Sequence, residues 1–392
     1  VDSLRLKYLQ ASEDTIKIKI LHDLYGQYQD TLPQKAKEVL LQAVRIATNI
    51  DHEHLKFKSY NTYGDFLYNQ SEFDSAIATY RIGLKWAEKI NYQEGMSSSL
   101  QDIGDTYLRK GNIEKALEYQ QKNLVLSEKS NDEFNMANSY NSMGLIHLEK
   151  NGYTKAMEFF TLASKKFLKL DNLEEYSVTL ANIGLIQREL GNDKSAIDYF
   201  HRADSIFKKL DLKSYRAFTL DHLSLLHKET ENLDQAIAYS NEAFGIYELM
   251  GNQRGMAMSL MTMGNIDFRK KNFPEALKIY KRSLDIFKKI GDSIYMAHIV
   301  NDLGKTYYEL KEVELAKGFL SHAAQIADSI GLDMIQMNSR QDLGKIYAGE
   351  GNFAKAYENI NQYAVLKDSL FTKEKRELAS ESEAKYQNEQ KV

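Results

Sequence analysis

The chain has 392 residues, with 51 lysines and arginines against 55 aspartates and glutamates, so its formal net charge is −4. A balance this close to neutrality creates no overall field that would attract nucleic acid or an anionic membrane. The absence of cysteine excludes disulfides, thiolate metal sites and cysteine nucleophiles, and the presence of only two prolines favours long helices joined by short turns.

The first elements predict an atypical helical hairpin that caps the chain over residues 1–56. The stretch SEDTIKIKILHDLYGQYQDTLPQKAKEVL contains Ala36, which begins a recurring alanine column, and Pro33, which suits the first turn of a helix. The start VDSLRLKYLQ lacks both an initiating methionine and the apolar core of a signal peptide, and no run in the chain is apolar and long enough to span a bilayer. We expect a processed or trimmed piece of a longer protein, from which a secretion signal could have been removed.

A small residue then returns every forty positions through residues 57–371. These small residues are Gly64, Gly104, Gly144, Gly184, Ser224, Gly264, Gly304 and Gly344. An alanine follows twelve residues after each of them, at Ala76, Ala116, Ala156, Ala196, Ala236, Ala276, Ala316 and Ala356, and Ala36 extends this column one step upstream. Nine alanines at one spacing predict nine repeats.

Each unit has the pattern of two helices separated by a short turn. The residue before the small position is large, as at Ile103, and apolar residues three and four apart define one helical face. Turn signals such as Gly111-Asn112 come next, followed by a second amphipathic segment that carries the alanine. We expect the small residues to lie where the two helices cross, because a larger side chain would hold the backbones apart.

This order of a large residue, glycine, tyrosine, Gly-Asn and alanine resembles the tetratricopeptide repeat, whose standard unit has about 34 residues. Versions of about forty residues are similar to those of cell-polarity scaffolds and bacterial quorum-peptide receptors. The resemblance covers residues 17 to about 371. It implies an all-α, right-handed superhelical solenoid of about nine hairpins, in which the first helix of every unit lines a concave groove.

The last segment, residues 372–392, predicts a charged helical extension. Apolar residues at Ala364, Phe371 and Leu378 are seven apart, which is the spacing of a short coiled coil. A homodimer through this C-terminal helix is therefore one prediction.

Catalysis has little support in the sequence. None of the nine histidines forms a His-Glu-x-x-His pair, and the chain has no phosphate-binding glycine loop, dinucleotide fingerprint or nucleophile elbow. His52 and His54 lie at a turn between repeats, where a solvated pair is favoured over a zinc site. We predict a non-enzymatic protein with no cofactor and no metal, which acts by binding a protein or peptide.

Two columns of each first helix are expected to point into the groove: the residue three before the small position and the residue one after it. The candidate partner-binding residues are Asn61, Asp65, Gln101, Asp105, Asn141, Leu145, Leu185, Asp221, Leu225, Asn265, Asn301, Lys305, Gln341 and Lys345. Amides of the first column can donate to and accept from a peptide backbone, or they can bind neighbouring helices and stiffen the stack. The second column runs from acidic through leucine to basic, which predicts either a polarised partner site or leucines that pack between adjacent helices.

Chaperone-binding tetratricopeptide proteins hold a C-terminal carboxylate with lysine, asparagine and arginine at set groove positions. The corresponding front positions here carry Asp65 and Asp105, so a heat-shock co-chaperone role is not expected. The partner predicted for this end is instead a peptide or helix with a basic terminus.

The two ends of the chain resemble those of bacterial tetratricopeptide sensor proteins. The N-terminal VDSLRLKYLQASEDTIKIKILHDLYGQY is similar to a mature sensor N-terminus, and LKDSLFTKEKRELASESEAKYQNEQ is similar to the linker that precedes a membrane helix and a histidine kinase or helix-turn-helix output domain. This resemblance implies a periplasmic or extracytoplasmic sensor region that passes partner binding to its C-terminal helix. The alternative is a cytoplasmic scaffold or quorum-peptide-receptor-like regulator that modulates a partner's activity, including its phosphorylation state, by binding it.

Overall fold

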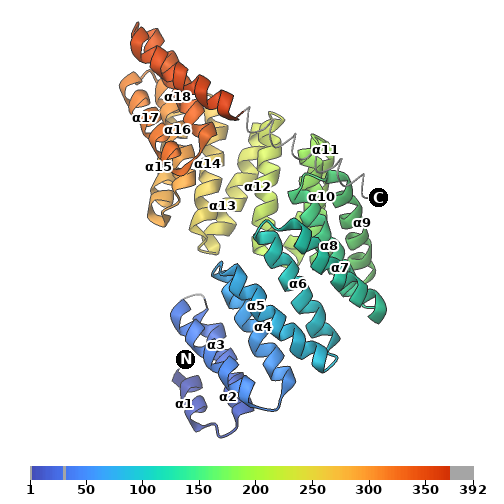
Figure 1. Ribbon diagram of the computed structural model, residues 1–392. Helices are drawn as coiled ribbons and strands as arrows, with labels where there is room; N and C mark the ends of the chain where they lie inside the picture. The colour runs from blue at the N-terminus through green and yellow to red at the C-terminus, as the bar shows by residue number, and fades with distance from the viewer. Residues whose placement is uncertain (1, 30–31, 371–392) are drawn as a thin grey trace. The chain divides into compact units, whose positions relative to one another are not determined.

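The computed structural model describes residues 2–29 and 32–370, and all regular structure within them is α-helical (Figure 1). The helices are α1 (Asp2–Gln10), α2 (Asp14–Tyr28), α3 (Pro33–Asn49), α4 (Glu53–Asn69), α5 (Phe73–Lys89), α6 (Gln93–Arg109), α7 (Ile113–Ser130), α8 (Glu133–Glu149), α9 (Tyr153–Lys169), α10 (Leu173–Glu189), α11 (Asp193–Lys209), α12 (Lys213–Glu229), α13 (Leu233–Leu249), α14 (Gln253–Arg269), α15 (Phe273–Ile290), α16 (Ser293–Glu309), α17 (Val313–Ile330) and α18 (Asp333–Gly349). A further helical segment spans 353–370. After the short α1, these helices pair in chain order from α2 with α3 to α18 with 353–370, which confirms the predicted all-α architecture of helical hairpins.

The chain divides into two compact units, Val1–Ile206 (unit 1) and Phe207–Val392 (unit 2). The division falls within α11, near the end of a hairpin. The capping hairpin predicted for residues 1–56 lies in unit 1, and α4 begins at Glu53, inside that range. The extension predicted for 372–392, with its coiled coil and dimer contact, lies outside the described residues, and the domain boundaries remain a prediction.

The turns have a period of twenty residues, half that of the small residues. One residue with positive φ occurs in each turn, from Ser71 (φ 62°) and Asn91 (φ 52°) through Gly111 (φ 73°) to Gly351 (φ 76°). A single left-handed residue ends a helix and lets the next backbone N–H groups satisfy its last carbonyls. At Gly111 the bonds are Gly111 N to Leu108 O at 2.8 Å and Asn112 N to Tyr107 O at 2.9 Å. From α4 to α18 these short stops fix the helix length at 17 or 18 residues, whereas α3 is followed by Ile50 with φ −100°.

Within each hairpin the small residue faces the residue sixteen positions later. A Cβ added to Gly144 would lie 2.7 Å from the Phe160 ring, and one added to Gly264 would lie 2.5 Å from the Tyr280 ring. The one serine of the column, Ser224, follows the same rule: its Oγ lies 3.2 Å from Ser240 Oγ and also donates to Ala236 O at 2.8 Å. The alanine column is buried without measurable exposure from Ala36 to Ala316. The small columns therefore serve helix packing, as predicted.

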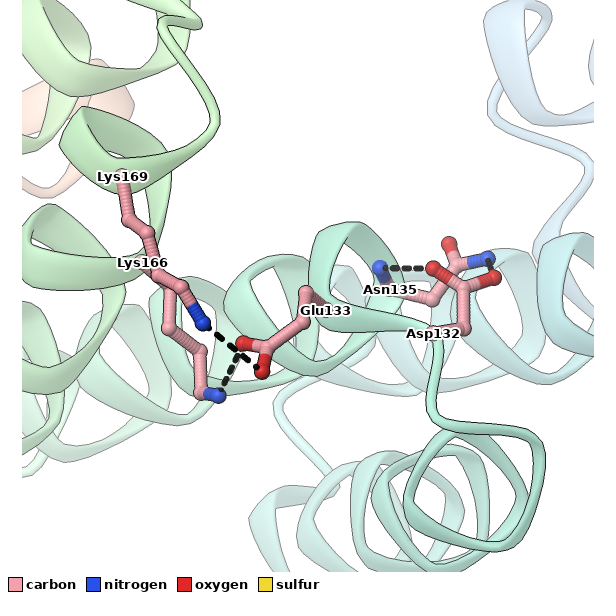
Figure 2. Close-up of polar contacts among 5 residues, drawn as sticks. All are labelled: Asp132, Glu133, Asn135, Lys166 and Lys169. Carbon is pink, nitrogen blue, oxygen red and sulfur yellow. Dashed lines mark hydrogen bonds and ion pairs between the residues drawn. The ribbon is translucent and has the colours of Figure 1, made fainter.

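Ion pairs close the open end of the hairpin formed by α8 and α9. Figure 2 shows Glu133, at the start of α8, between Lys166 Nζ at 2.5 Å and Lys169 Nζ at 3.5 Å, which both lie near the end of α9. The same figure shows Asp132 capping α8, with Oδ1 accepting from Asn135 N at 3.0 Å. An acid at a helix start and bases at a helix end each suit the local helix dipole, so the pairing stabilises both ends at once.

The first helices of successive hairpins form one continuous layer in each unit, which we call the first-helix layer. In unit 1, α2, α4, α6, α8 and α10 contact one another in that order, and in unit 2 the same holds for α12, α14, α16 and α18. Among the described second helices, α3, α5, α7 and α9 make no such contacts with one another, nor do α13, α15 and α17. Because stacked hairpins lie closest on the inner side of a curve, the first-helix layer is the inner face of each unit.

Candidate functional site

Amides of the predicted groove column connect successive first helices. Asn61 Nδ2 on α4 donates to Asp102 Oδ2 on α6 at 3.1 Å, and Asn61 Oδ1 accepts from Ser99 Oγ at 3.1 Å. In unit 2, Asn301 Oδ1 on α16 accepts from Ser339 Oγ on α18 at 2.9 Å. These contacts support the interpretation that the amides stiffen the stack, and they occupy part of the hydrogen-bonding capacity that a peptide would need.

The same column also contains polar groups with other partners. Asp221 accepts from Tyr247 Oη at 2.7 Å and from Ser259 Oγ at 3.3 Å. Asn141 Oδ1 is buried and has no hydrogen-bond partner within the part of the chain that the structure describes. One amide oxygen on the inner face of unit 1 is therefore available to a donor that reaches it.

In the column one after the small residue, three polar side chains form hydrogen bonds with the second helix of their own hairpin. Tyr80 Oη donates to Asp65 Oδ1 at 2.8 Å, and Gln120 Nε2 donates to Asp105 Oδ1 at 3.0 Å. In unit 2, Tyr280 Oη donates to Asn265 Oδ1 at 2.7 Å. At these three positions a polar residue thus has a polar partner fifteen residues later, whereas Lys305 and Lys345 have Leu320 and Ile360 there.

Where the partner position holds phenylalanine, the groove position holds leucine. Leu145 packs against the cluster that contains Phe160, and Leu185 occupies the equivalent place before Phe200. From Asp65 to Leu185, the acidic-to-leucine order seen in the sequence therefore follows the residue type at the partner position, whereas Leu225 has Ser240 there. This pairing is visible in the sequence at a spacing of fifteen, although the sequence analysis did not use it.

Buried carboxyl groups make the inner face of unit 1 less acidic than its sequence suggests. Burial, with Asp65 nearby, raises the pKa of Asp102 to about 7, and burial raises the pKa of Asp105 to about 6. Burial also raises the pKa of Asp65 above its usual range. Near neutral pH, Asp102 is therefore partly protonated, and a cation brought beside it would favour the charged form.

A pocket of about 400 Å³ opens on the first-helix layer of unit 2, and we call it the first-helix pocket. It is lined by Phe268, Lys305, Tyr308, Glu309, Leu320, Asn338, Gln341, Asp342, Lys345 and Ile346. Helices α14, α16, α17 and α18 supply these residues, and three of them, Lys305, Gln341 and Lys345, are predicted groove residues. The sequence analysis missed the others, although Tyr308 and Asn338 lie one helical turn from predicted positions on the same helix faces.

The first-helix pocket combines an apolar base with polar and charged groups. Leu320 and Ile346 are buried, while Tyr308 is 40% exposed. Lysine and carboxylate side chains both line it, and Lys345 Nζ lies 3.4 Å from Asp342 Oδ1. Such a mixture of apolar surface with a few polar groups is typical of a site that binds a ligand in a defined orientation.

Unit 1 has a smaller hollow of about 270 Å³ at Leu185. Its lining comprises Leu148, Glu149, Asn151, Tyr153, Leu185, Arg188 and Glu189. The predicted groove residues are divided between the two units: unit 1 contains Asn61, Asp65, Gln101, Asp105, Asn141, Leu145 and Leu185, and unit 2 contains Asp221, Leu225, Asn265, Asn301, Lys305, Gln341 and Lys345.

Residues 2–29 and 32–370 contain no group of three or more histidine, aspartate or glutamate side chains placed to hold a metal ion. His52 instead caps α4, with its Nδ1 accepting from Leu55 N at 3.4 Å. Across the same ranges, no helix combines the length and apolar character needed to cross a membrane.

A family model described as the tetratricopeptide repeat matches residues 95–169 and 255–329. No curated protein sequence matches the chain. Among solved structures, the chain resembles a signal transduction ATPase with numerous domains (STAND) that has a tetratricopeptide repeat sensor, from Pyrococcus horikoshii. The TM-score is 0.67 at 16% identity, over 90% of this chain and 54% of that one. The chain thus spans about half the length of that ATPase.

Two further structures share the fold. The apo form of the quorum sensor NprR from B. thuringiensis gives a TM-score of 0.61 at 13% identity, over 89% of this chain and 98% of that one. A Rap protein complexed with competence and sporulation factor gives a TM-score of 0.55 at 14% identity, over 81% of this chain and 86% of that one. At such identities the likeness concerns the fold.

These comparisons correct one prediction. The periplasmic or extracytoplasmic location implied by the sequence resemblance is not supported and is withdrawn, because the solved structures that share the fold are described as a quorum sensor and a STAND ATPase and not as periplasmic sensors. The segments that match the family model, one in each unit, are tetratricopeptide repeats, and they lie within an unbroken succession of hairpins of the same length.

Proposed function

We propose that this protein is a receptor module that binds an extended peptide, or a peptide-like segment of a protein, on its first-helix layer. The observation that carries the proposal is the first-helix pocket, which offers apolar surface, two amides and both signs of charge within about 400 Å³. The fold shared with the quorum sensor NprR, and with a Rap protein complexed with competence and sporulation factor, supports a peptide ligand.

The pocket suits a peptide residue with a large apolar side chain. That side chain would lie on Leu320 and Ile346, beside the partly exposed ring of Tyr308. Asn338 and Gln341 could donate to and accept from the peptide backbone, since each amide does both. Lys305 and Lys345 would then favour a carboxylate in the ligand, while Glu309 and Asp342 would favour a cation at a neighbouring ligand position.

The remaining predicted groove residues belong to this proposal as secondary contacts. In unit 1 the carboxyl groups of Asp65 and Asp105 favour a basic ligand segment, and Leu185 offers an apolar contact in its hollow. The protein acts here by non-covalent recognition and not by catalysis.

The second candidate function is narrower: the sensor region of a signal-transduction protein, which passes ligand binding to its C-terminal helix. The tetratricopeptide repeat sensor of the STAND ATPase favours it. A scaffold or quorum-peptide-receptor-like regulator that modulates a partner by binding is its competitor. Sedimentation with and without a selected peptide tests whether residues 372–392 also form a homodimer.

The primary proposal is tested by selecting peptides from a random library on the immobilised protein and measuring their affinity by calorimetry. We expect Lys305→Glu and Lys345→Glu each to lower the affinity for a selected peptide at least tenfold, because each substitution reverses a charge in the pocket. Lys289→Glu, an exposed position on the second helix α15, is the matched control. Equal affinity in all three variants would contradict the assignment of the pocket.

A further inference from the structure

A second pocket of about 400 Å³ lies at the N-terminal end of unit 1, and we call it the histidine pocket. It is lined by Thr15, Ile18, Lys19, His22, His52, His54, Leu55 and Lys58. Helix α2 and the start of α4 supply these residues. Neither the repeat pattern nor the first-helix pocket, which lies in unit 2, accounts for this grouping.

All the ionisable side chains that line the histidine pocket are basic. Two lysines and three histidines line it and no carboxylate does, in a chain that has more acidic than basic residues. The acid at the start of α4, Glu53, pairs instead with Lys89 at 2.7 Å, and Asp14 at the start of α2 pairs with Lys17 at 3.3 Å. These carboxylates are therefore already engaged by cations that do not line the pocket.

Two of the three histidines have defined hydrogen-bond partners, which leave His52 as a donor toward a ligand. His52 Nδ1 accepts from Leu55 N, so in the neutral ring the proton is on Nε2, which leaves a donor. Burial, together with Lys58 nearby, lowers the pKa of His22 to about 4, while Asp23 acts in the opposite direction. The His22 ring is neutral at neutral pH, with Nε2 at 3.3 Å from Ser59 Oγ.

The base of the pocket is apolar, since Ile18 is 1% and Leu55 is 6% exposed. A low-dielectric base strengthens the attraction between a bound charge and the lysines above it. The first turns of α2 and α4, which begin two successive hairpins, also carry backbone N–H groups without intrahelical partners, and these add to the positive potential made by the side chains. An anion in the pocket would offset the repulsion between these positive groups.

We propose that the histidine pocket binds a small oxyanionic metabolite, with Lys19 and Lys58 supplying charge and His52 and His54 supplying donors. The volume exceeds that of a single inorganic phosphate and suits a phosphate ester or a di- or tricarboxylate. Phosphate esters and polycarboxylates present the same chemistry to the pocket, namely several negatively charged oxygen atoms. This site is independent of the peptide site proposed above.

The test is calorimetric titration of the full chain with three probes: inorganic phosphate, pyrophosphate and citrate. We expect pyrophosphate or citrate to bind, and the better of the two identifies the ligand as a phosphate ester or a polycarboxylate. The Lys19→Ala/Lys58→Ala double variant should bind at least tenfold more weakly. The Lys17→Ala/Lys85→Ala double variant removes the same charge outside the pocket and should bind like the unaltered protein.

Histidine imidazole resonances locate the bound anion without a variant. We expect the signals of His52 and His54 to move on titration with the better probe, while those of His147 and His298, which lie in other hairpins, stay in place. Absence of binding by both pyrophosphate and citrate, or equal weakening in the two double variants, would overturn the proposal.

Discussion

Asp102 shows how one side chain can link packing to electrostatics on the inner face. Its Oδ2 accepts from Asn61 Nδ2 at 3.1 Å and from Ser98 Oγ at 3.3 Å, so it is part of the contact between α4 and α6. Burial is the main reason why its pKa rises to about 7, and Asp65 adds to the effect. Hydrogen bonds to the carboxylate oppose the rise without cancelling it.

A dependence of stability on pH follows from this raised pKa. The folded protein holds a proton on Asp102 that the unfolded chain releases near pH 3.8, so this group reduces stability as pH rises from about 4 to about 7, and the loss is complete above that range. Asp102→Asn should therefore gain stability relative to the unaltered protein across the same range, by at most about 4 kcal/mol.

Urea denaturation at pH 5 and pH 8 measures this difference. The exposed Asp285→Asn serves as control and should show the same difference from the unaltered protein at both pH values. A constant effect of Asp102→Asn at the two pH values would contradict the raised pKa.

At the scale of the element, the hairpin depends on close contact between its two helices. The glycine column allows this contact, since an added Cβ at Gly264 would lie 2.5 Å from the Tyr280 ring, which is 1% exposed. A buried ring packed on both sides has little room to move, so the backbone of α14 or α15 would have to shift.

Gly264→Ala should accordingly destabilise the protein by about 1–3 kcal/mol through overpacking. Gly318→Ala is the matched control, because Gly318 also lies within a helix but an added Cβ would meet nothing within 4 Å. The control should be neutral or stabilising by up to about 1 kcal/mol, because alanine favours the helix. Similar losses for both variants in urea denaturation would show that the close approach is not the cause.

The hairpins could be predicted because the residues that define them recur in the sequence itself. Gly104 and Gly144 are forty residues apart, and both lie against the side chain sixteen positions later, where an added Cβ would clash. The match between Asp65 and Tyr80 was harder to foresee, since it depends on which residues of two antiparallel helices face each other.

The pockets were less predictable than the hairpins. Lys305 and Lys345 came from a column of the repeat, but Phe268 enters the first-helix pocket from a different hairpin and outside both columns. The histidine pocket joins His22 of the irregular N-terminal hairpin to His54 of the next one, so no periodic signal marks it. Sites between repeats need the three-dimensional register that repetition alone does not provide.

At the scale of the whole molecule, stability is distributed along the chain. Each hairpin contacts its neighbours in sequence, and among the described helices no contact joins hairpins that are further apart within a unit. Proteins of this kind behave as linear arrays in which a local loss of stability spreads only to adjacent repeats.

Hydrogen exchange should reveal this locality. In Gly264→Ala we expect faster amide exchange in α14 and α15 and in the helices directly beside them, with rates in α4 to α8 unchanged. Mass-spectrometric exchange on the intact protein measures both regions in one experiment. Uniformly faster exchange throughout would indicate a single cooperative unit instead.

The left-handed residue that follows each helix from α4 to α18 also bears on how such a chain can change in length. These stops recur every twenty residues, from Ser71 to Gly351. One residue gained or lost within a helix would rotate the rest of that helix by about 100° about its axis. The buried side chains between the change and the next stop would then no longer face their neighbours. A gain or loss of forty residues would keep every facing pair intact, so duplication or deletion of entire repeats is the change that a gene for this protein can tolerate best.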